Sequence, residues 1–252
     1  GLDFIVAFFG CLYAGAVAVP SSMPQTRRGL TRLQAIADDA QAACALTTRQ
    51  VLSRIELLTD QQASWTDRLD WLTSDAIADD AAEDWHEPLT NSNSLAYLQY
   101  TSGSTSSPKG VMVTHGNVLE NSAYIQHGFR HDPQSVSLSW LPHFHDMGLV
   151  DGIIQPLYSG FTGLLMSPIA LLQNPARWLQ AISRYGVTHS GGPNFAYDLC
   201  VRRIDEAERA ALDLSTWSVA YNGSEPVRHE TLERFTAAFS SCGFRRQAFY
   251  PA

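Results

Sequence analysis

Short apolar runs rich in β-branched residues alternate with longer stretches of helical periodicity along most of this 252-residue chain. Alternation of this kind predicts βαβ units. The expected fold class is therefore α/β, with mostly parallel β-sheets flanked by helices and one large domain. The runs predict strands near residues 16–20, 43–46, 95–100, 111–114, 135–140, 162–166, 187–190 and 218–221. The periodic stretches predict helices over 2–14, about 30–40, 148–158, 176–185, 194–204 and 228–239, with Asn117 as the N-cap of a further helix.

An almost unbroken apolar run covers residues 4–19. It is shorter than the roughly 20 residues that cross a bilayer, and Gly10 and Gly15 interrupt it. No Lys or Arg precedes it, which argues against a secretory signal, although residues 16–18 read Ala-Val-Ala. We expect a core helix followed by a buried strand, and no transmembrane segment.

The charge and the cysteines exclude several classes of protein. With 17 basic and 25 acidic side chains the formal charge is −8, so no electrostatic attraction to nucleic acid or to an anionic membrane is expected. The composition is 45% apolar and 17% charged, which excludes disorder as the main state. The four cysteines form no C-x-x-C pair. Reduced thiols and a cytoplasmic location are therefore expected.

A loop of small polar residues lies between the strands expected at 95–100 and 111–114. It carries Lys109, the single lysine of the chain, directly before Gly110. Backbone N–H groups, hydroxyls and one ammonium group in such a loop are suited to binding phosphates. The order Lys then Gly is not that of a Walker A loop. A flexible linker is the alternative, but the flanking strands favour the phosphate-binding hypothesis. The remaining candidate residues are Thr101, Ser102, Gly103, Ser104 and Thr105.

A second motif follows the strand expected at 135–140. It contains His143, His145 and Asp146, and two imidazoles separated by one residue on an extended chain could share a metal ion. However, Asp146 follows His145 directly and no third histidine follows. We therefore expect no metal site here. Asp146 is also a candidate cap for the next helix.

Two further turns lie at predicted strand ends, where α/β sheets bind ligands. The first contains Asn222, Gly223, Ser224 and Glu225 before Pro226. The second is residues 190–194. Its glycines, Gly191 and Gly192, could equally form a plain turn or line a pocket.

Together these motifs resemble the adenylate-forming superfamily of acyl-CoA synthetases, luciferases and adenylation domains. The resemblance rests on residues 100–105 and 108–110, and it is greatest to the fatty acyl-AMP ligases in residues 1–20, 138–160, 165–184, 190–200 and 221–227. It extends over nearly the whole chain and is weakest at 46–87.

The resemblance implies ATP-dependent activation of a fatty acid to an acyl-adenylate, with Mg²⁺ on the phosphates, and transfer of the acyl group to an acyl carrier protein or carrier domain. It implies catalytic roles for Lys109 and His145. The implied nucleotide-binding residues are Thr101, Ser102, Gly103, Ser104, Thr105, Lys109, Gly110, Asn222, Gly223, Ser224 and Glu225. The implied acyl-binding residues are His145, Asp146, Met147, Gly148, Gly191, Gly192, Pro193 and Asn194. From helical spacing, one or two of Ile153, Ile154, Leu157 and Tyr158 are expected to contact the acyl chain as well, although most apolar stripes of this kind are ordinary core.

The same resemblance sets the expected domain organisation. Residues 1–252 would be part of the large N-terminal adenylation domain, without its C-terminal part or the small C-terminal domain, so this chain alone is expected to adenylate poorly. Ser106 departs from the family, which usually has glycine there. Alternatives are a fatty acyl-CoA ligase, a non-catalytic module that binds nucleotide or acyl chains, and a structural interaction domain.

Overall fold

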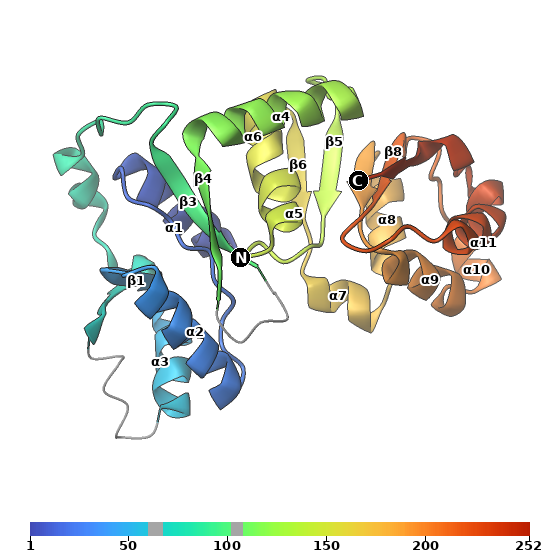
Figure 1. Cartoon of the computed structure of the whole chain (residues 1–252). Coiled ribbons are helices and arrows are strands. Elements are labelled where there is room, and N and C mark those ends of the chain that lie inside the picture. Colours follow the sequence, from blue (N-terminus) through green and yellow to red (C-terminus); the bar gives the residue numbers. More distant parts are fainter. Residues whose placement is uncertain (60–67, 102–107) are drawn as a thin grey trace. The chain divides into compact units, whose positions relative to one another are not determined.

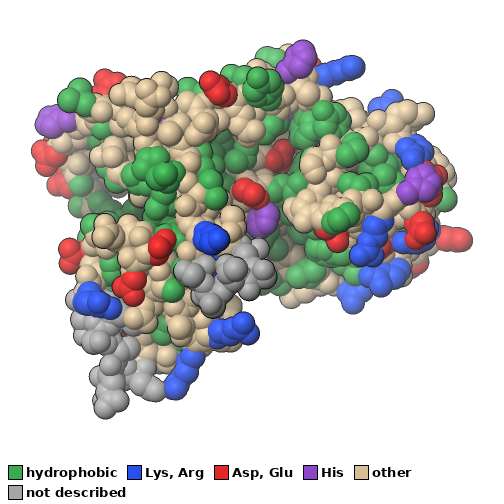
Figure 2. Space-filling model, in the orientation of Figure 1, with side chains coloured by type: hydrophobic (Ala, Val, Ile, Leu, Met, Phe, Trp, Pro, Cys, Tyr) green, Lys and Arg blue, Asp and Glu red, His purple; other side chains and the backbone are tan. Residues whose placement is uncertain are grey.

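The computed structural model describes residues 1–59, 68–101 and 108–252. The described chain divides into two compact units, Gly1–Leu119 and Glu120–Ala252, where the sequence predicted one domain. Figure 1 shows the elements of each unit. The face in Figure 2 carries side chains of both charge signs.

The first unit combines helices with two small sheets. Strands β1 and β2 pair in parallel, whereas β3 and β4 form an antiparallel hairpin. Leu30 and Ile55 are at the centre of a small apolar cluster beneath the helices. Within its described residues the unit contains α1 (Leu2–Tyr13), α2 (Arg27–Asp39), β1 (Cys44–Thr47), α3 (Arg49–Leu58), β2 (Asp70–Thr73), short 3-10 turns (Ser74–Ala76 and Asp79–Asp84), β3 (Leu95–Tyr100) and β4 (Gly110–Thr114).

The apolar N-terminal run forms the expected helix but not the expected strand. In α1 only Phe8 is fully buried, and Leu2, Val6 and Tyr13 are each more than half exposed, so the expectation of a core helix was too strong. In place of a strand over 16–20 there is an isolated parallel bridge from Ala18 to Tyr97. Among the described residues, no helix combines the length and the apolar character needed to cross a membrane.

Helix α4 (His115–Phe129) begins earlier than predicted and leads from the first unit into the second. Thr114, not Asn117, occupies the capping position: its Oγ1 accepts a hydrogen bond from the Asn117 N–H at 3.1 Å. Asn117 Oδ1 accepts the Thr114 N–H at 3.1 Å in return. This reciprocal pattern is that of a capping box.

The second unit is built on a five-stranded sheet in which every neighbouring pair is parallel, as the sequence predicted. The strand order is β6-β5-β7-β8-β9. After α4 the unit contains β5 (Val136–Ser139), α5 (Asp146–Leu149), a π-helical turn (Val150–Ile154), α6 (Gln155–Ser159), β6 (Thr162–Leu165), α7 (Pro168–Gln173), α8 (Ala176–Tyr185), β7 (His189–Gly191), α9 (Asn194–Arg203), α10 (Glu206–Ala210), β8 (Val219–Asn222), α11 (His229–Phe239), 3-10 turns (Ser240–Cys242 and Arg246–Ala248) and β9 (Phe249–Pro251).

Helices cover both faces of this sheet. On one face Trp140 packs edge-on against Trp178 of α8, which in turn contacts Trp217. On the other face the segment from α5 to α6 lies so close to β5 that a Cβ added to Gly152 would be 2.7 Å from Ser139 Oγ. Side chains alternate between the faces of a strand, so one apolar core and one partly polar layer result.

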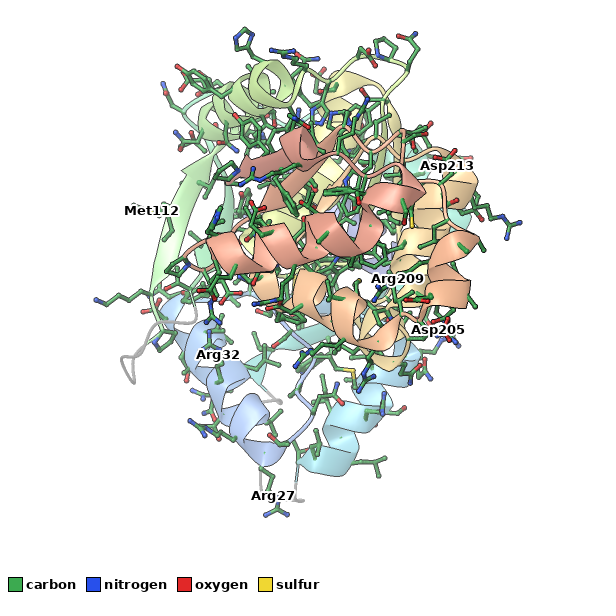
Figure 3. All side chains as sticks on the ribbon, turned by 90° about the vertical axis from the view of Figure 1, so that its right-hand side faces the viewer. Arg27, Arg32, Met112, Asp205, Arg209 and Asp213 are labelled. Atoms are coloured by element: carbon green, nitrogen blue, oxygen red, sulfur yellow. The ribbon has the colours of Figure 1, made fainter. Side chains whose placement is uncertain are left out.

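Several elements were not predicted: α3, α7, α10, β2 and β9. For α10 a local signal existed, because Asp205 and Glu208 form a capping box. Figure 3 labels Asp205 together with Arg209, which follows one turn later and donates to the Val201 carbonyl at 2.8 Å.

Candidate active site

The carboxyl ends of β5, β7, β8 and β9 meet at one edge of the parallel sheet. The chain passes from β5 outward to β6, then returns to place β7 on the other side of β5 and continues to β8 and β9. The strand order therefore reverses between β5 and β7. In open α/β sheets ligands bind at such a switch point. The predicted residues of this unit, at 145–148, 191–194 and 222–225, lie at the ends of these strands or after them: Gly191 ends β7 and Asn222 ends β8.

His145 and Asp146 form an exposed pair at the start of α5. His145 precedes the helix in extended conformation, and its Nδ1 lies 2.6 Å from Asp146 Oδ1. This contact occupies Nδ1, which leaves Nε2 as the ring nitrogen available to a ligand. Asp146 is the first helical residue, so the prediction that it caps the helix was wrong. Its Oδ1 accepts the Met147 N–H at 2.6 Å.

The alternative of a metal site at His143 and His145 is not supported. The His145 N–H donates to the Pro142 carbonyl at 3.0 Å, so the two histidines lie in a turn and not on an extended chain. Burial lowers the pKa of His143, whereas His145 is exposed. Among the described residues there is no group of three His, Cys, Asp or Glu side chains that could hold a metal ion.

Met147 connects the predicted motif at 145–148 with the predicted turn at 222–225. Ser224 Oγ donates to Met147 Sδ at 3.4 Å. A Cβ added to Gly223 would lie 2.9 Å from Met147 Cε and 2.5 Å from the Ala252 carbonyl oxygen. The turn after β8 is thus enclosed by Met147 on one side and by the end of β9 on the other.

The backbone of this turn is strained at Ser224. Its φ of +66° is in the left-handed region, which costs a non-glycine residue about 1–2 kcal/mol. Strained residues of this kind are concentrated at functional sites. Glu225, the next residue, is partly buried.

Three predicted glycines have packing reasons for being glycine. A Cβ on Gly148 would collide with the Pro142 carbonyl, one on Gly191 with Tyr221, and one on Gly192 with the Trp140 ring. The space beside each α-carbon is therefore filled by the protein itself. For Gly191 and Gly192 this favours the close turn over the pocket wall. Pro193 precedes α9, and the next residue, Asn194, is buried.

A buried acid that sequence reasoning missed lies behind this edge. Asp151, in the π-helical turn, accepts a hydrogen bond from the Tyr221 hydroxyl at 2.7 Å. Burial raises the pKa of Asp151 to about 6. Asp151 has no sequence motif of its own, because its partner is 70 residues away. A π-turn is itself frequent at functional sites.

The phosphate-type loop belongs to the first unit and is described by itself. Tyr100 and Gly110 are opposite each other where β3 and β4 pair, which confirms the two strands predicted on either side of the loop. Thr101 and Lys109 are exposed, and the Thr101 N–H donates to the Lys109 carbonyl at 3.3 Å. The predicted residues Ser102, Gly103, Ser104 and Thr105, and also Ser106, lie outside the described residues.

A second cation beside this loop was not predicted. Arg32 of α2 donates from Nη2 to the Thr101 carbonyl at 3.1 Å (labelled in Figure 3). The helical pattern of residues 30–40 predicted the helix but not this contact. Arg32 therefore places a positive charge at Thr101, at the base of the loop.

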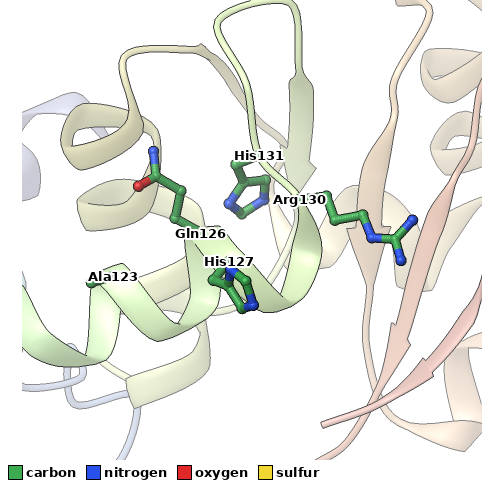
Figure 4. A pocket seen from close by; sticks show the side chains of 5 residues that line it. All are labelled: Ala123, Gln126, His127, Arg130 and His131. Atoms are coloured by element: carbon green, nitrogen blue, oxygen red, sulfur yellow. The ribbon is translucent and has the colours of Figure 1, made fainter.

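A cavity of about 560 Å³ lies at the opposite edge of the sheet, before β5 begins (Figure 4). It contains none of the predicted site residues. Burial and the neighbouring His189 lower the pKa of His131 to about 4, so this imidazole is neutral near pH 7. The cavity is lined by Ala123, Gln126, His127, Arg130 and His131.

Comparison with known proteins identifies the class that this fold and site define. The family model for AMP-binding enzymes matches residues 1–246, and the chain belongs to this family. The medium-chain-fatty-acid–[acyl-carrier-protein] ligase JamA of Moorena producens is 53% identical over 255 residues, which cover 100% of this chain and 43% of JamA. A putative fatty-acid–CoA ligase, fadD21, of Mycobacterium leprae is 39% identical over 264 residues. The match covers 100% of this chain and 44% of fadD21.

Solved structures agree in fold. The fatty acyl-adenylate ligase of L. pneumophila, in complex with acyl adenylate and pyrophosphate, superimposes with a TM-score of 0.91 at 43% identity. The match covers 100% of this chain and 43% of that one. The chain thus spans less than half the length of these relatives.

Proposed function

We propose that this chain is the N-terminal part of the large adenylation domain of a fatty acyl-AMP ligase, which activates a fatty acid with ATP and transfers the acyl group to an acyl carrier protein. The observation that carries the proposal is the meeting of the 145–148 and 222–224 motifs at the switch point of the sheet. The relatives described above support the choice of substrate and acceptor.

In the proposed reaction a carboxylate oxygen of the fatty acid attacks the α-phosphorus of ATP. A new P–O bond forms, the bond to pyrophosphate breaks, and pyrophosphate leaves. Both reactants are anions, so catalysis requires charge neutralisation and alignment. We assign neutralisation of the outer phosphates to Lys109, with Arg32 as a supporting cation. The exposed Nε2 of His145 would contact the acyl carboxylate, and the 222–225 turn would hold adenine.

Mg²⁺ fits this proposal without a dedicated protein site. The described residues offer no set of three metal-binding side chains. Mg²⁺ usually keeps several waters and binds substrate phosphates with one or two carboxylates. The phosphates of ATP would therefore supply most of its ligands, and the ion would neutralise their charge.

The four free cysteines support the proposed cytoplasmic location.

The test is the variant Lys109→Ala in the longer ligase that contains this chain. We expect acyl-adenylate formation to fall by about 10²-fold or more while fatty acid binding is retained, because removal of one group that stabilises transition-state charge has an effect of this size. Arg28→Ala, which removes an exposed cation from α2, is the matched control. Unchanged adenylate formation in Lys109→Ala would refute the role of the loop.

The similarity to a putative fatty-acid–CoA ligase supports a second candidate function, transfer of the acyl group to CoA. Both functions share the adenylation step and differ in the thiol that accepts the acyl group. Supplying the longer ligase with CoA or with a carrier protein distinguishes them. Acyl-CoA as the main product would favour the second function.

A further inference from the structure

The side chain of Asn194 is buried beneath the turn that follows β8. It is the first residue of α9 and only 2% exposed. Its Oδ1 accepts hydrogen bonds from Asn222 Nδ2 at 3.1 Å and from the Arg228 N–H at 2.9 Å. Its Nδ2 donates to the Pro226 carbonyl at 3.0 Å. Each of these hydrogen bonds therefore ends on the stretch 222–228.

The two backbone partners determine which way the Asn194 amide faces. The Arg228 N–H can only donate and the Pro226 carbonyl can only accept, so exchanging the oxygen and nitrogen of Asn194 would lose both bonds. Asn194 Oδ1 must then also face Asn222. Asn222 consequently presents its Nδ2 to Asn194, and its amide orientation is set in turn.

This arrangement leaves Asn222 Oδ1 as an acceptor. Asn222 is 1% exposed, and its Oδ1 has no hydrogen-bond partner among the residues that the structure describes. A buried acceptor without a partner is costly, and it is satisfied when a ligand supplies a donor. Adenine carries an exocyclic amine that donates. Hypoxanthine carries a carbonyl oxygen in its place, which does not.

A neighbouring residue of α9, Tyr197, makes its hydrogen bond to the backbone of β8 and not to the Asn222 side chain. The Tyr197 hydroxyl donates to the Tyr221 carbonyl at 2.7 Å, and Tyr197 is fully buried. Within the part of the chain that the structure describes, no hydrogen bond joins Tyr197 to the Asn222 amide. A substitution at Tyr197 therefore tests the support of β8 without changing the hydrogen bond that orients the Asn222 amide.

We propose that Asn194 is a positioning residue for the nucleotide: it orients the Asn222 amide so that the turn prefers an adenine base. The family resemblance implied that Asn194 binds the acyl group, and this inference places Asn194 on the nucleotide side instead. It rests on the proposed function.

The experiment compares Asn194→Ala, Asn194→Asp and Tyr197→Phe in the longer ligase, with ATP and with ITP as the nucleotide. For Asn194→Ala we expect the KM for ATP to rise about tenfold, the effect of losing one hydrogen bond to a ligand, with the KM for the fatty acid unchanged. The preference for ATP over ITP should fall by a similar factor. Asn194→Asp keeps the acceptor and should retain most of the preference.

Tyr197→Phe is the matched control, because it removes a buried hydrogen bond to β8 without touching the Asn222 amide. It should lower thermal stability yet leave the preference for ATP over ITP unchanged. Should Asn194→Ala fail to fold, Asn222→Ala replaces it, because it removes the Oδ1 acceptor itself. An unchanged preference for ATP over ITP in Asn222→Ala, or an equal loss of preference in Tyr197→Phe, would overturn the inference.

The outcomes separate the two proposals. If the unaltered ligase forms no acyl-adenylate, the proposed function is wrong. If it does, and a folded Asn194→Ala variant keeps the ATP KM and the nucleotide preference of the unaltered enzyme, only the role of Asn194 is refuted.

Discussion

At the scale of single residues, the buried Asp151 carboxyl makes the stability of the folded state depend on pH. Its pKa is raised from 3.8 to about 6 by burial, and the Tyr221 hydrogen bond only partly opposes this effect. Between these two pH values the folded protein binds a proton that the unfolded chain has released. This contribution to stability is therefore largest at low pH and is lost as the pH rises through 6.

We predict that Asp151→Asn removes this pH dependence. The shift from 3.8 to about 6 lowers the free energy of unfolding of the unaltered protein by roughly 2 kcal/mol as the pH rises from 4 to 7. The free energy of unfolding of the variant, relative to the unaltered protein, should thus increase with pH over this interval and then level off. Urea unfolding followed by tryptophan fluorescence measures it.

The His131 imidazole acts in the opposite direction. Burial lowers its pKa from 6.5 to about 4, so its contribution to stability is lost as the pH falls through this range. In the unaltered protein this effect therefore partly offsets that of Asp151, which is why the comparison is made with Asp151→Asn. Parallel stability curves for Asp151→Asn and the unaltered chain would contradict the assignment to Asp151.

The glycines show what residue-level prediction could and could not achieve. The turn containing Gly191 and Gly192 was found in the sequence because small residues at a strand end are a local signal, whereas Gly148 was singled out by the family resemblance. What each glycine makes room for was not predictable. Pro142, Tyr221 and Trp140 fill those spaces through tertiary packing that no spacing encodes.

At the scale of secondary-structure elements, the start of α4 depends on the capping interaction between Thr114 and Asn117. Thr114 Oγ1 satisfies one N–H of the first helical turn, and Asn117 Oδ1 accepts the Thr114 N–H. These local bonds decide where the hairpin ends and the helix begins.

We predict that Thr114→Ala lowers the free energy of unfolding by about 1 kcal/mol, the usual effect of removing a helix cap. Asn121→Ala is the matched control, because Asn121 is exposed in the middle of the same helix. It should stabilise the chain slightly, by about 0.5 kcal/mol, since alanine has the higher helix propensity. Chemical denaturation followed by circular dichroism measures both. Equal effects of the two substitutions would show that the cap is not stabilising.

Element prediction succeeded where local pattern determines structure. The strand Leu95–Tyr100 and the helix Ala176–Tyr185 have the predicted bounds, because apolar runs and helical periodicity mark them. The order of the strands could not be predicted, since pairing joins residues far apart in the chain. Without that order the switch point between β5 and β7 was invisible, and so was the reason why the motifs meet there.

At the scale of the whole molecule, the proposed chemistry needs more than the groups described here. The turns after β5, β7 and β8 lie at one edge of the sheet in the second unit. The lysine that the proposal assigns to the phosphates belongs to the first unit. JamA, however, is matched over only 43% of its length. Attack on the α-phosphorus depends on holding both reactants in one geometry, and effective molarities for such alignment are large.

We predict that this chain alone releases pyrophosphate from ATP and a fatty acid at least about 10²-fold more slowly than the longer ligase, because incomplete alignment and charge neutralisation each cost this much. An enzyme-coupled pyrophosphate assay on both proteins measures the ratio, and the same assay without protein provides the background rate. ATP binding to the chain should persist, since binding needs fewer groups than catalysis. Similar rates for the two proteins would mean that residues 1–252 already align the reactants, and the remaining length of the relatives would then serve the transfer step.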